Sequence, residues 1–337
     1  MFKALFVGDP HLSSHSIGSR KDDYAETCLT KLTFVLRTAI AQKCNAILIP
    51  GDLFHDKEES KISRSLDAAL YNFLDFCAKS GIVVLTVPGN HDMLFHNPDV
   101  SKRPFGLLAR AKDNFKLVSA EPYIYKDSEL SVGVTGSPFT FNGDKGDIKE
   151  RKQYFPNRLD VDYQIHITHG SQIPYSTSGD FKFMNFTSSE DIIAANPVWD
   201  LNFNGHIHWV GEENLLMRFG KKAILNPGSL TRGSLKMENI KRNIFVYTLE
   251  LHKINGEVIP TFERIEVPHQ KAEDVFDVNA YLGEKQMDKK IAEFIEQLKE
   301  CTLSEKSSNT NIEKLIEESK VSPEVKKKAK EFLEKLS

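Results

Sequence analysis

The chain has 337 residues, of which 40% are apolar and 27% are charged, and its formal net charge is −3. This composition is ordinary for a globular protein with one large domain or two unequal ones. No stretch reaches the roughly 20 apolar residues of a membrane-spanning helix. Because the net charge is slightly negative, a nucleic-acid partner would have to be attracted by local basic clusters or by bound metal.

The first part of the chain alternates apolar strands with amphipathic helices. We expect strands at residues 4–7, 46–49 and 82–87, and helices at residues 22–43 and 60–80, where apolar side chains recur at helical spacing. Continuous apolar strands in this order favour parallel βαβ units and a sheet that is covered on both faces.

The middle of the chain is less regular. Its predicted elements are a helix at 104–112, strands at 115–118, 123–125 and 130–136, a loop at 142–158, and strands at 163–168, 201–204 and 223–225. The last two strands before the loop are candidates for an antiparallel pair. Residues 187–190 match a capping box, which predicts a helix that continues through Ala195.

A hairpin precedes a change of character near residue 268. Asn255-Gly256 is a strong turn signal and predicts antiparallel strands at 244–252 and 257–267. Beyond it, charged segments with helical periodicity occur at 287–298, 312–319 and 322–336. The sequence therefore predicts a main domain over 1–268, a reduced cap or linker over 269–301 and C-terminal helices over 302–337.

The four cysteines lack the C-x-x-C spacing of metal and redox motifs, which favours reduced thiols in a cytosolic protein. They are Cys28, Cys44, Cys77 and Cys301.

Potential metal ligands follow five of the apolar runs. They are Asp9 and His11, Asp52, Asn90 with His91 and Asp92, His169, and His206 with His208. Taken singly, Asp52 could be an ordinary turn residue and His208 an ordinary surface or core histidine. Together, oxygen and nitrogen ligands without thiolate suit Mn²⁺, Fe²⁺ or Zn²⁺ better than Ca²⁺. A carboxylate such as Asp52 can bridge two ions, and such a pair clamps a phosphate group.

This ordered set resembles the calcineurin-like metallophosphoesterase superfamily over roughly residues 1–235. The resemblance implies an α/β fold, a β-sandwich flanked by helices, with a dinuclear metal site at the strand ends. It implies one metal on Asp9, His11, Asp52 and His208, and the other on Asp52, Asn90, His169 and His206. It also implies two divalent ions, with Mn²⁺ expected and Mg²⁺, Fe²⁺ or Zn²⁺ as alternatives.

Two motifs resemble one branch of this superfamily, the SbcD family of DNA-repair nuclease subunits. They are Gly-Asp-Leu-Phe-His at residues 51–55 and Asn-Pro-Gly-Ser-Leu-Thr-Arg at residues 226–232. Protein phosphatases of the superfamily instead carry Gly-Asp-x-x-Asp-Arg-Gly and Gly-Asn-His-Glu. The resemblance implies a cytoplasmic exo- or endodeoxyribonuclease of a bacterial or phage-infected cell. Its partners would be DNA, an SbcC-like SMC-type ATPase and a second copy of the chain.

The same resemblance assigns roles around the metals. His91 would protonate the leaving oxygen or stabilise the phosphate, with Asp92 orienting it from behind. His55 would be a second phosphate-handling histidine, the alternative being a plain turn residue. Arg232 is a candidate phosphate contact, although a solvated loop arginine fits the sequence equally well.

Two further segments keep alternative interpretations. Residues 171–186, with Tyr175 and Lys182, could stack on a substrate strand or simply pack onto the core. The C-terminal helices could cover the protein's own core or dock on the ATPase. For the whole chain, the alternatives to a nuclease are a phosphodiesterase acting on a nucleotide or small molecule, and a non-catalytic scaffold that tethers an ATPase to DNA ends.

Overall fold

The computed structural model describes residues 1–16, 20–57, 63–181, 184–233 and 242–279, with single positions at 282, 316–317, 323, 325–327 and 330. The chain divides into two compact units, Met1–Val275 and Phe276–Ser337. The expected C-terminal helices fall outside the described residues except at those single positions. Among the residues described, no helix has the length and apolar character needed to cross a membrane.

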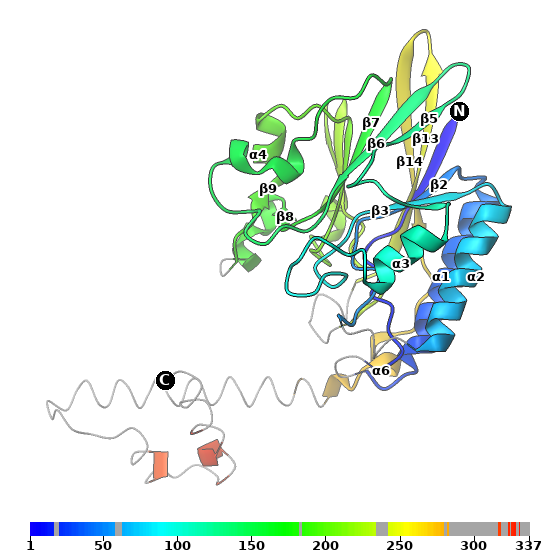
Figure 1. Cartoon of the computed structure of the whole chain (residues 1–337). Coiled ribbons are helices and arrows are strands. Elements are labelled where there is room, and N and C mark those ends of the chain that lie inside the picture. Colours follow the sequence, from blue (N-terminus) through cyan, green and yellow to red (C-terminus); the bar gives the residue numbers. More distant parts are fainter. Residues whose placement is uncertain are drawn as a thin grey trace, which may run out of the picture. The chain divides into compact units, whose positions relative to one another are not determined.

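The first unit contains a six-stranded sheet that begins the chain (Figure 1). Its order is β14-β13-β1-β2-β3-β4, in which β1 to β4 run parallel and β13 runs antiparallel to both β1 and β14. The bounds are β1 Phe2–Phe6, β2 Ala46–Ile49, β3 Val83–Thr86, β4 Phe115–Leu117, β13 Phe245–Ile254 and β14 Glu257–Glu266. The predicted parallel core and the predicted hairpin are both confirmed.

A second six-stranded sheet has the order β11-β12-β10-β7-β6-β5. Its four inner strands are parallel, and β5 and β11 are antiparallel edges. The bounds are β5 Tyr123–Lys126, β6 Ser131–Ser137, β7 Tyr163–His169, β10 Leu201–Gly205, β11 Leu216–Phe219 and β12 Lys222–Leu225. The antiparallel β5–β6 pair was predicted, whereas β11 was not.

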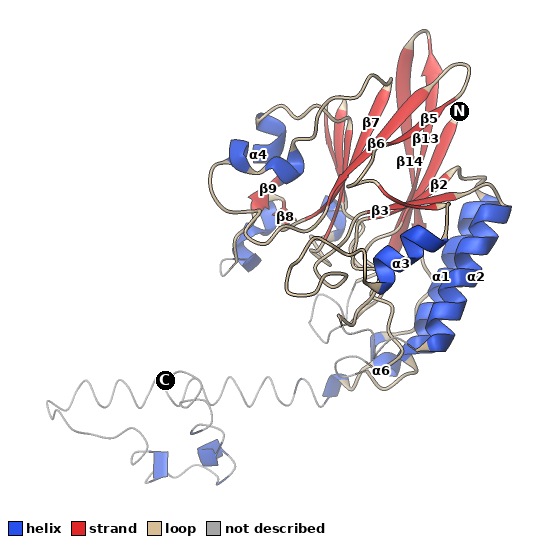
Figure 2. Ribbon diagram, in the orientation of Figure 1, coloured by secondary structure: helices blue, strands red, loops and turns tan. Residues whose placement is uncertain are grey.

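Helices lie beside the first sheet, and strands fill the centre of the unit (Figure 2). They are α1 Tyr24–Ala41, α2 Arg64–Lys79 and α3 Pro104–Ala111. The Asp23 side chain caps α1 by accepting the N–H of Glu26, and Ser63 caps α2 by accepting the N–H of Leu66. These caps satisfy backbone donors that the first turn of a helix leaves unpaired.

The connections contain short elements that the sequence did not predict. Two 3₁₀ turns, η2 Ile148–Glu150 and η3 Lys152–Tyr154, lie in the segment expected to be a loop. The other unpredicted elements are β8 Gln172–Ile173, η4 Tyr175–Phe181, β9 Thr187–Ser188, η5 Glu212–Asn214 and α6 Ala272–Val275. The helix predicted after the capping box is present as α4 Ser189–Ala194.

The cap of α4 differs by one residue from the predicted capping box. Ser188 accepts the N–H groups of Glu190 and Asp191, so Ser188 is the cap. Thr187 is occupied elsewhere, because its hydroxyl bonds Asp144 at 2.5 Å and accepts from Arg151.

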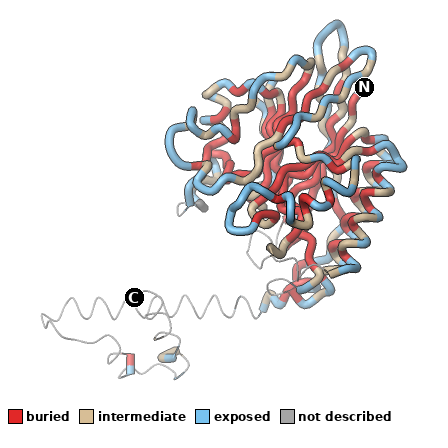
Figure 3. Tube along the Cα trace, viewed as in Figure 1, coloured by how far each residue is buried: buried red, intermediate tan, exposed pale blue. Residues whose placement is uncertain are grey.

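Two apolar layers hold the first sheet, and Figure 3 shows the buried positions concentrated along the strands. One side of it packs on α1 and α2 through residues such as Leu5, Val35 and Phe73. The other side packs on the second sheet, where the rings of Phe6 and Phe203 meet edge to face at 4.9 Å. Such aromatic pairs contribute about 0.5–1.5 kcal/mol beyond their buried area. The mixed α/β fold with two sheets and flanking helices is thus as expected.

Three cysteines, Cys28, Cys44 and Cys77, are buried free thiols, as predicted. Cys301 lies outside the described residues.

Candidate metal centre

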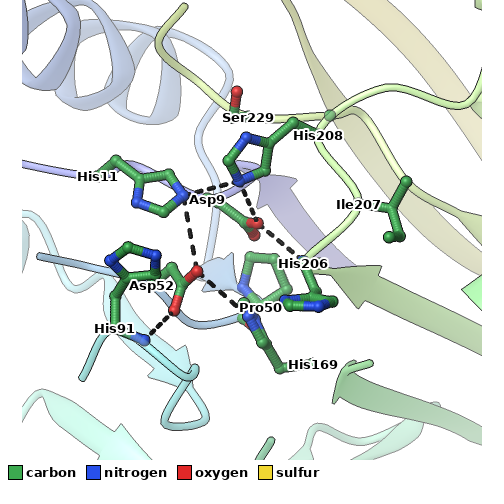
Figure 4. A network of polar contacts seen from close by, with 12 residues as sticks. Asp9, His11, Pro50, Asp52, His91, His169, His206, Ile207, His208 and Ser229 are labelled. Carbon is green, nitrogen blue, oxygen red and sulfur yellow. Dashed lines mark hydrogen bonds and ion pairs between the residues drawn. The ribbon is translucent and has the colours of Figure 1, made fainter. Parts of the chain in front are cut away.

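The carboxyl ends of five strands, three from one sheet and two from the other, bring polar side chains to one place (Figure 4). The first sheet supplies residues that follow β1, β2 and β3, and the second supplies residues at or after the ends of β7 and β10. In that order they are Asp9 and His11, Asp52, Asn90, His169, and His206 with His208.

These side chains form two ligand groups that share one carboxylate. Ligand atoms of Asp9, His11, Asp52 and His208 all lie within 4.8 Å of one another, as do those of Asp52, His169 and His206. The Asn90 amide oxygen joins the second group, at 3.2 Å from Nε2 of His169 and 2.9 Å from Nδ1 of His206. The family resemblance implies these same residues as ligands, and their role in binding metal stays a prediction.

Asp52 lies between the groups. Its Oδ2 is 3.6 Å from Nε2 of His11 and 3.3 Å from Nε2 of His169. Its Oδ1 accepts the backbone N–H of His91 at 2.8 Å. One carboxylate oxygen therefore faces both ligand groups, which suits a bridge between two ions.

Neighbouring carbonyl groups fix the tautomer of His169. The carbonyl oxygen of Pro50 lies 2.7 Å from its Nδ1, and a carbonyl can only accept, so Nδ1 carries the proton. The lone pair on Nε2 then points toward Asp52 and Asn90, as a metal ligand requires. Burial lowers the pKa of His169, but the charges of Asp52 and Asp9 outweigh it and raise the pKa to about 9. The negative charges that favour a proton on Nε2 would equally favour a metal cation in place of that proton.

The first ligand group, which includes Asp9, His11 and His208, also fits a cation. Nε2 of His11 and Nε2 of His208 lie 2.8 Å apart, and burial lowers both pKa values, that of His208 to about 3. Burial also raises the pKa of Asp9 to about 6. Oδ1 of Asp9 is buried without a hydrogen-bond partner among the described residues. Neutral imidazoles that face each other beside an unsatisfied carboxylate oxygen fit a divalent cation.

Three of the ligand residues have a left-handed backbone. The φ angles are 46° at His11, 48° at Asp52 and 81° at His206, a region that non-glycine residues seldom occupy. Such conformations cost energy and persist only where the surrounding structure enforces them, typically at functional sites.

Two glycines leave room for the ligands. A Cβ on Gly89 would lie 2.2 Å from Oδ1 of Asp52, and a Cβ on Gly205 would lie 2.3 Å from Oδ1 of Asp9. Any larger residue would therefore displace a carboxylate of the site.

The structure corrects the role expected for Asp92. Its buried carboxylate accepts the N–H of Gly89 at 2.8 Å and those of Leu53 and Phe54 at 3.4 and 3.3 Å. Asp92 therefore joins the loops that follow β2 and β3. The ring of His91 is instead oriented by the carbonyl oxygen of His55, 2.6 Å from its Nδ1.

His55 and His91 form a third cluster with His11. The rings of His55 and His91 are stacked at 5.4 Å, and each lies within 5.6 Å of the His11 ring. Burial, then the neighbouring His91, lowers the pKa of His55. Both histidines therefore adjoin the first ligand group.

The remaining predicted substrate contacts are Arg232, Tyr175 and Lys182. Arg232 is only 4% exposed and donates to the carbonyl oxygen of Gln270, so it is not a solvated loop arginine, and its contact with a substrate phosphate stays a prediction. Tyr175 is exposed, but its hydroxyl donates to Asp191 at 2.5 Å. Phe186 packs against the core between the sheets, as the alternative interpretation of its segment had it. Lys182 lies outside the described residues.

An aromatic rim beside the second ligand group was not predicted. We use this name for His96, Phe139 and Phe141. The ring of Phe139 lies 5.3 Å from that of His206, and His96 stacks on Phe141 at 4.7 Å. Phe141 is 61% exposed. The sequence signal that could have predicted the rim is the pair Phe139 and Phe141, which stands in a polar segment just after a strand.

Comparison with known proteins identifies the family. The model of the calcineurin-like phosphoesterases matches residues 2–210, more than half of the chain. The chain belongs to the calcineurin-like phosphoesterase family. It is accordingly a metal-dependent phosphoesterase, and its two groups of His and Asp side chains could hold the divalent ions that the family uses.

Two solved structures are among those similar to this phosphoesterase. A dimetal phosphatase from Danio rerio aligns with a TM-score of 0.41 and 11% identity, covering 80% of this chain and 99% of that one. The sulfate thiohydrolase SoxB of Thermus thermophilus, in complex with glycerol, aligns with a TM-score of 0.40 and 12% identity, covering 83% of this chain and 59% of that one. No curated protein sequence matches the chain.

Proposed function

We propose that this phosphoesterase is a DNA nuclease, the nuclease subunit of an SbcC–SbcD-like repair complex. The observation that carries the proposal is the aromatic rim beside the metal ligands. Exposed aromatic faces bind single-stranded bases of any sequence, because every base presents a stacking face. The Gly-Asp-Leu-Phe-His motif at residues 51–55 supports the same proposal.

The ligand groups would hold two divalent ions, Mn²⁺ in our proposal, with Asp52 between them. Bound there, the ions would neutralise charge on the phosphate oxygens and lower the pKa of water. The chain supplies the remaining parts. Gly89 and Gly205 let the carboxylates approach, and the Pro50 carbonyl presents the lone pair of His169.

His91 is proposed as the general acid. The carbonyl oxygen of His55 lies 2.6 Å from its Nδ1, so Nδ1 carries a proton and Nε2 is left to exchange one. The same residue donates its backbone N–H to Asp52, which ties the acid to the bridging ligand. His91 would protonate the 3′ oxygen as it departs, a step that contributes about 10²–10⁴-fold in rate.

The test compares three substrates with one preparation of the full chain. Rates on single-stranded DNA, on duplex ends and on bis(p-nitrophenyl) phosphate are measured with Mn²⁺ and with EDTA. A nuclease turns over DNA with a much higher kcat/KM than the small diester, and EDTA abolishes both activities. Preference for the small diester would favour the alternative, a nucleotide or small-molecule phosphodiesterase. Metal-bound protein without activity would favour the scaffold.

The ATPase partner is a separate proposal, based on the family resemblance and the charged C-terminal sequence. Deleting residues 284–337 should abolish binding to an SbcC-like ATPase and leave the metal content unchanged. Self-association of the full chain, measured by analytical ultracentrifugation, tests the proposed homodimer.

A further inference from the structure

A cavity of about 210 Å³ lies beside the first turns of α1. None of the metal ligands lines it. Its basic residues are Arg20, Lys31, Arg232 and His269, and its acidic residues are Asp22, Asp23 and Glu26. The cavity is therefore a separate feature that the phosphoesterase chemistry does not explain.

Lys31 is an unusual residue for the buried face of a helix. Its side chain is only 4% exposed, and its buried Nζ has no hydrogen-bond partner among the described residues. Burial, then the nearby Arg242, Arg232 and Arg20, lowers the pKa of Lys31 to about 7. Burying an ammonium group without a partner costs free energy. An anion bound next to Lys31 would offset both the loss of hydration of Lys31 and its repulsion by the neighbouring arginines.

The acids of the cavity do not neutralise Lys31. Asp22 is occupied by Arg20, whose Nε donates to it at 2.8 Å, and by the hydroxyl of Thr27 at 2.8 Å. Asp23 caps α1, and both Asp23 and Glu26 are exposed. Arg232 donates to a neutral acceptor, the carbonyl oxygen of Gln270. Among the charged side chains that line the cavity, Lys31 is thus left without an acidic partner.

We propose that this cavity binds a phosphate-sized oxyanion through Lys31 and Arg232. Lysine and arginine are the usual donors to phosphate oxygens. The volume is several times the roughly 30 Å³ that one water occupies in the liquid, so a tetrahedral anion fits. The exposed carboxylates of Asp23 and Glu26 disfavour a polyanionic strand. The ligand is therefore free phosphate or the terminal phosphate of a small monoester.

Calorimetric titration with inorganic phosphate at constant ionic strength tests the proposal. The full chain carries Asp52→Asn, so that the metal centre contributes little phosphate binding. We expect saturable binding at one site in this protein and in its Lys21→Met derivative, which loses an exposed lysine of the same region. The Lys31→Met derivative should bind about 10- to 100-fold more weakly, because it loses a charge-assisted hydrogen bond.

Thermal unfolding separates loss of the site from loss of the fold. Lys31→Met removes an unpaired buried charge, so its Tm without phosphate should not fall, and phosphate should no longer raise it. Arg232→Gln provides a second variant with the same expectation for phosphate. A deoxynucleoside 5′-monophosphate, titrated in parallel, distinguishes a monoester from free phosphate as the ligand.

The proposal is overturned if phosphate does not bind saturably to the Asp52→Asn protein. It is also overturned if Lys31→Met and Lys21→Met bind phosphate equally well. Neither result depends on catalysis, so failure here is distinct from failure of the nuclease proposal.

Discussion

The backbone N–H of His91 donates a 2.8 Å hydrogen bond to Oδ1 of Asp52. The other oxygen of the same carboxylate faces His11 and His169, one from each ligand group. The proposed acid and the proposed bridge are therefore positioned by one another, although 39 residues separate them in the chain. Changes at these two positions should nevertheless have different effects.

Asp52→Asn should remove metal from the protein. An amide is neutral and cannot bridge two cations as a carboxylate does. Loss of outer-shell partners alone costs about 10–100-fold in metal affinity, so loss of the bridge should cost at least about 100-fold. Metal content after dialysis, measured by mass spectrometry, checks this. Asp75→Asn on α2 is the control and should keep its metal; equal metal in both variants would refute the bridge.

His91→Gln should keep the metal and lose activity selectively. Cleavage of DNA, whose leaving alkoxide needs a proton, should slow by about 10²–10⁴-fold. Hydrolysis of bis(p-nitrophenyl) phosphate should slow much less, because nitrophenolate leaves without protonation. Steady-state rates on both substrates check this, with the remote His252→Gln as control. An equal loss on both substrates would contradict the role of His91 as an acid.

Phe141→Ala should weaken binding of single-stranded DNA. Stacking of one base on an aromatic ring contributes about 1–3 kcal/mol, which corresponds to a rise in Kd of about 5- to 150-fold. Turnover of the small diester should be unchanged. Fluorescence anisotropy with a labelled oligonucleotide checks this. Phe76, 53% exposed on α2, gives the matched control Phe76→Ala; equal Kd values in the two variants would remove the rim from the substrate path.

Much of this site could be predicted because its ligands follow continuous apolar strands. Residues 46–49 form a continuous apolar run and residues 163–168 alternate apolar and polar side chains, so both segments are recognisable as strands. The sequence did not show that they belong to two different sheets whose carboxyl ends lie together. β11 escaped prediction because its four residues are only partly buried and belong to an edge strand. The role of Asp92 could not be predicted either, since its partners are backbone amides of another loop.

Arg232 illustrates the same difficulty. Its sequence context suggested a loop arginine available to phosphate. Its actual acceptor is a carbonyl group 38 residues further along the chain, and no local pattern encodes that distance. The rim residues were likewise placed together only by the fold, because His96 follows β3 whereas Phe139 and Phe141 follow β6.

His166 should make stability depend on pH. It is fully buried in β7, with its Nε2 2.8 Å from the carbonyl oxygen of Gln153. Burial lowers its pKa from 6.5 to about 4. Between these values the unfolded chain binds a proton that the folded chain does not. The free energy of unfolding therefore falls as the pH drops from 6.5 toward 4.

Urea unfolding at pH 7.5 and pH 5 checks this effect. Between pH 7.5 and pH 5, the free energy of unfolding of the wild type should fall by about 2 kcal/mol more than that of His166→Asn. The difference between the proteins is used because the metal ligands also titrate in this range. Parallel losses in both proteins would show that His166 is not the group responsible.

Gly205→Ala should impair the metal centre without unfolding the protein. The new Cβ would lie 2.3 Å from Oδ1 of Asp9 and 2.8 Å from Cγ of Pro50, so the carboxylate must move. We expect metal affinity to fall by at least about 10-fold, measured by competition with a chelating dye. Gly179→Ala is the control: a Cβ at Gly179 meets nothing within 4 Å, so the metal affinity of this variant should be unchanged. Full affinity in Gly205→Ala would show that Asp9 is not constrained there.

Each ligand group takes residues from both sheets. His208 of the second sheet completes the group of Asp9, His11 and Asp52, and Asp52 and Asn90 of the first sheet complete the group of His169 and His206. Neither metal can therefore be fully coordinated until the two sheets have packed face to face. We expect metal to bind late in folding, only after the two sheets have packed against each other. Small zinc domains differ, because they fold around their ion. Scarcity of metal in the cell would then leave a folded but inactive protein that regains activity when metal returns.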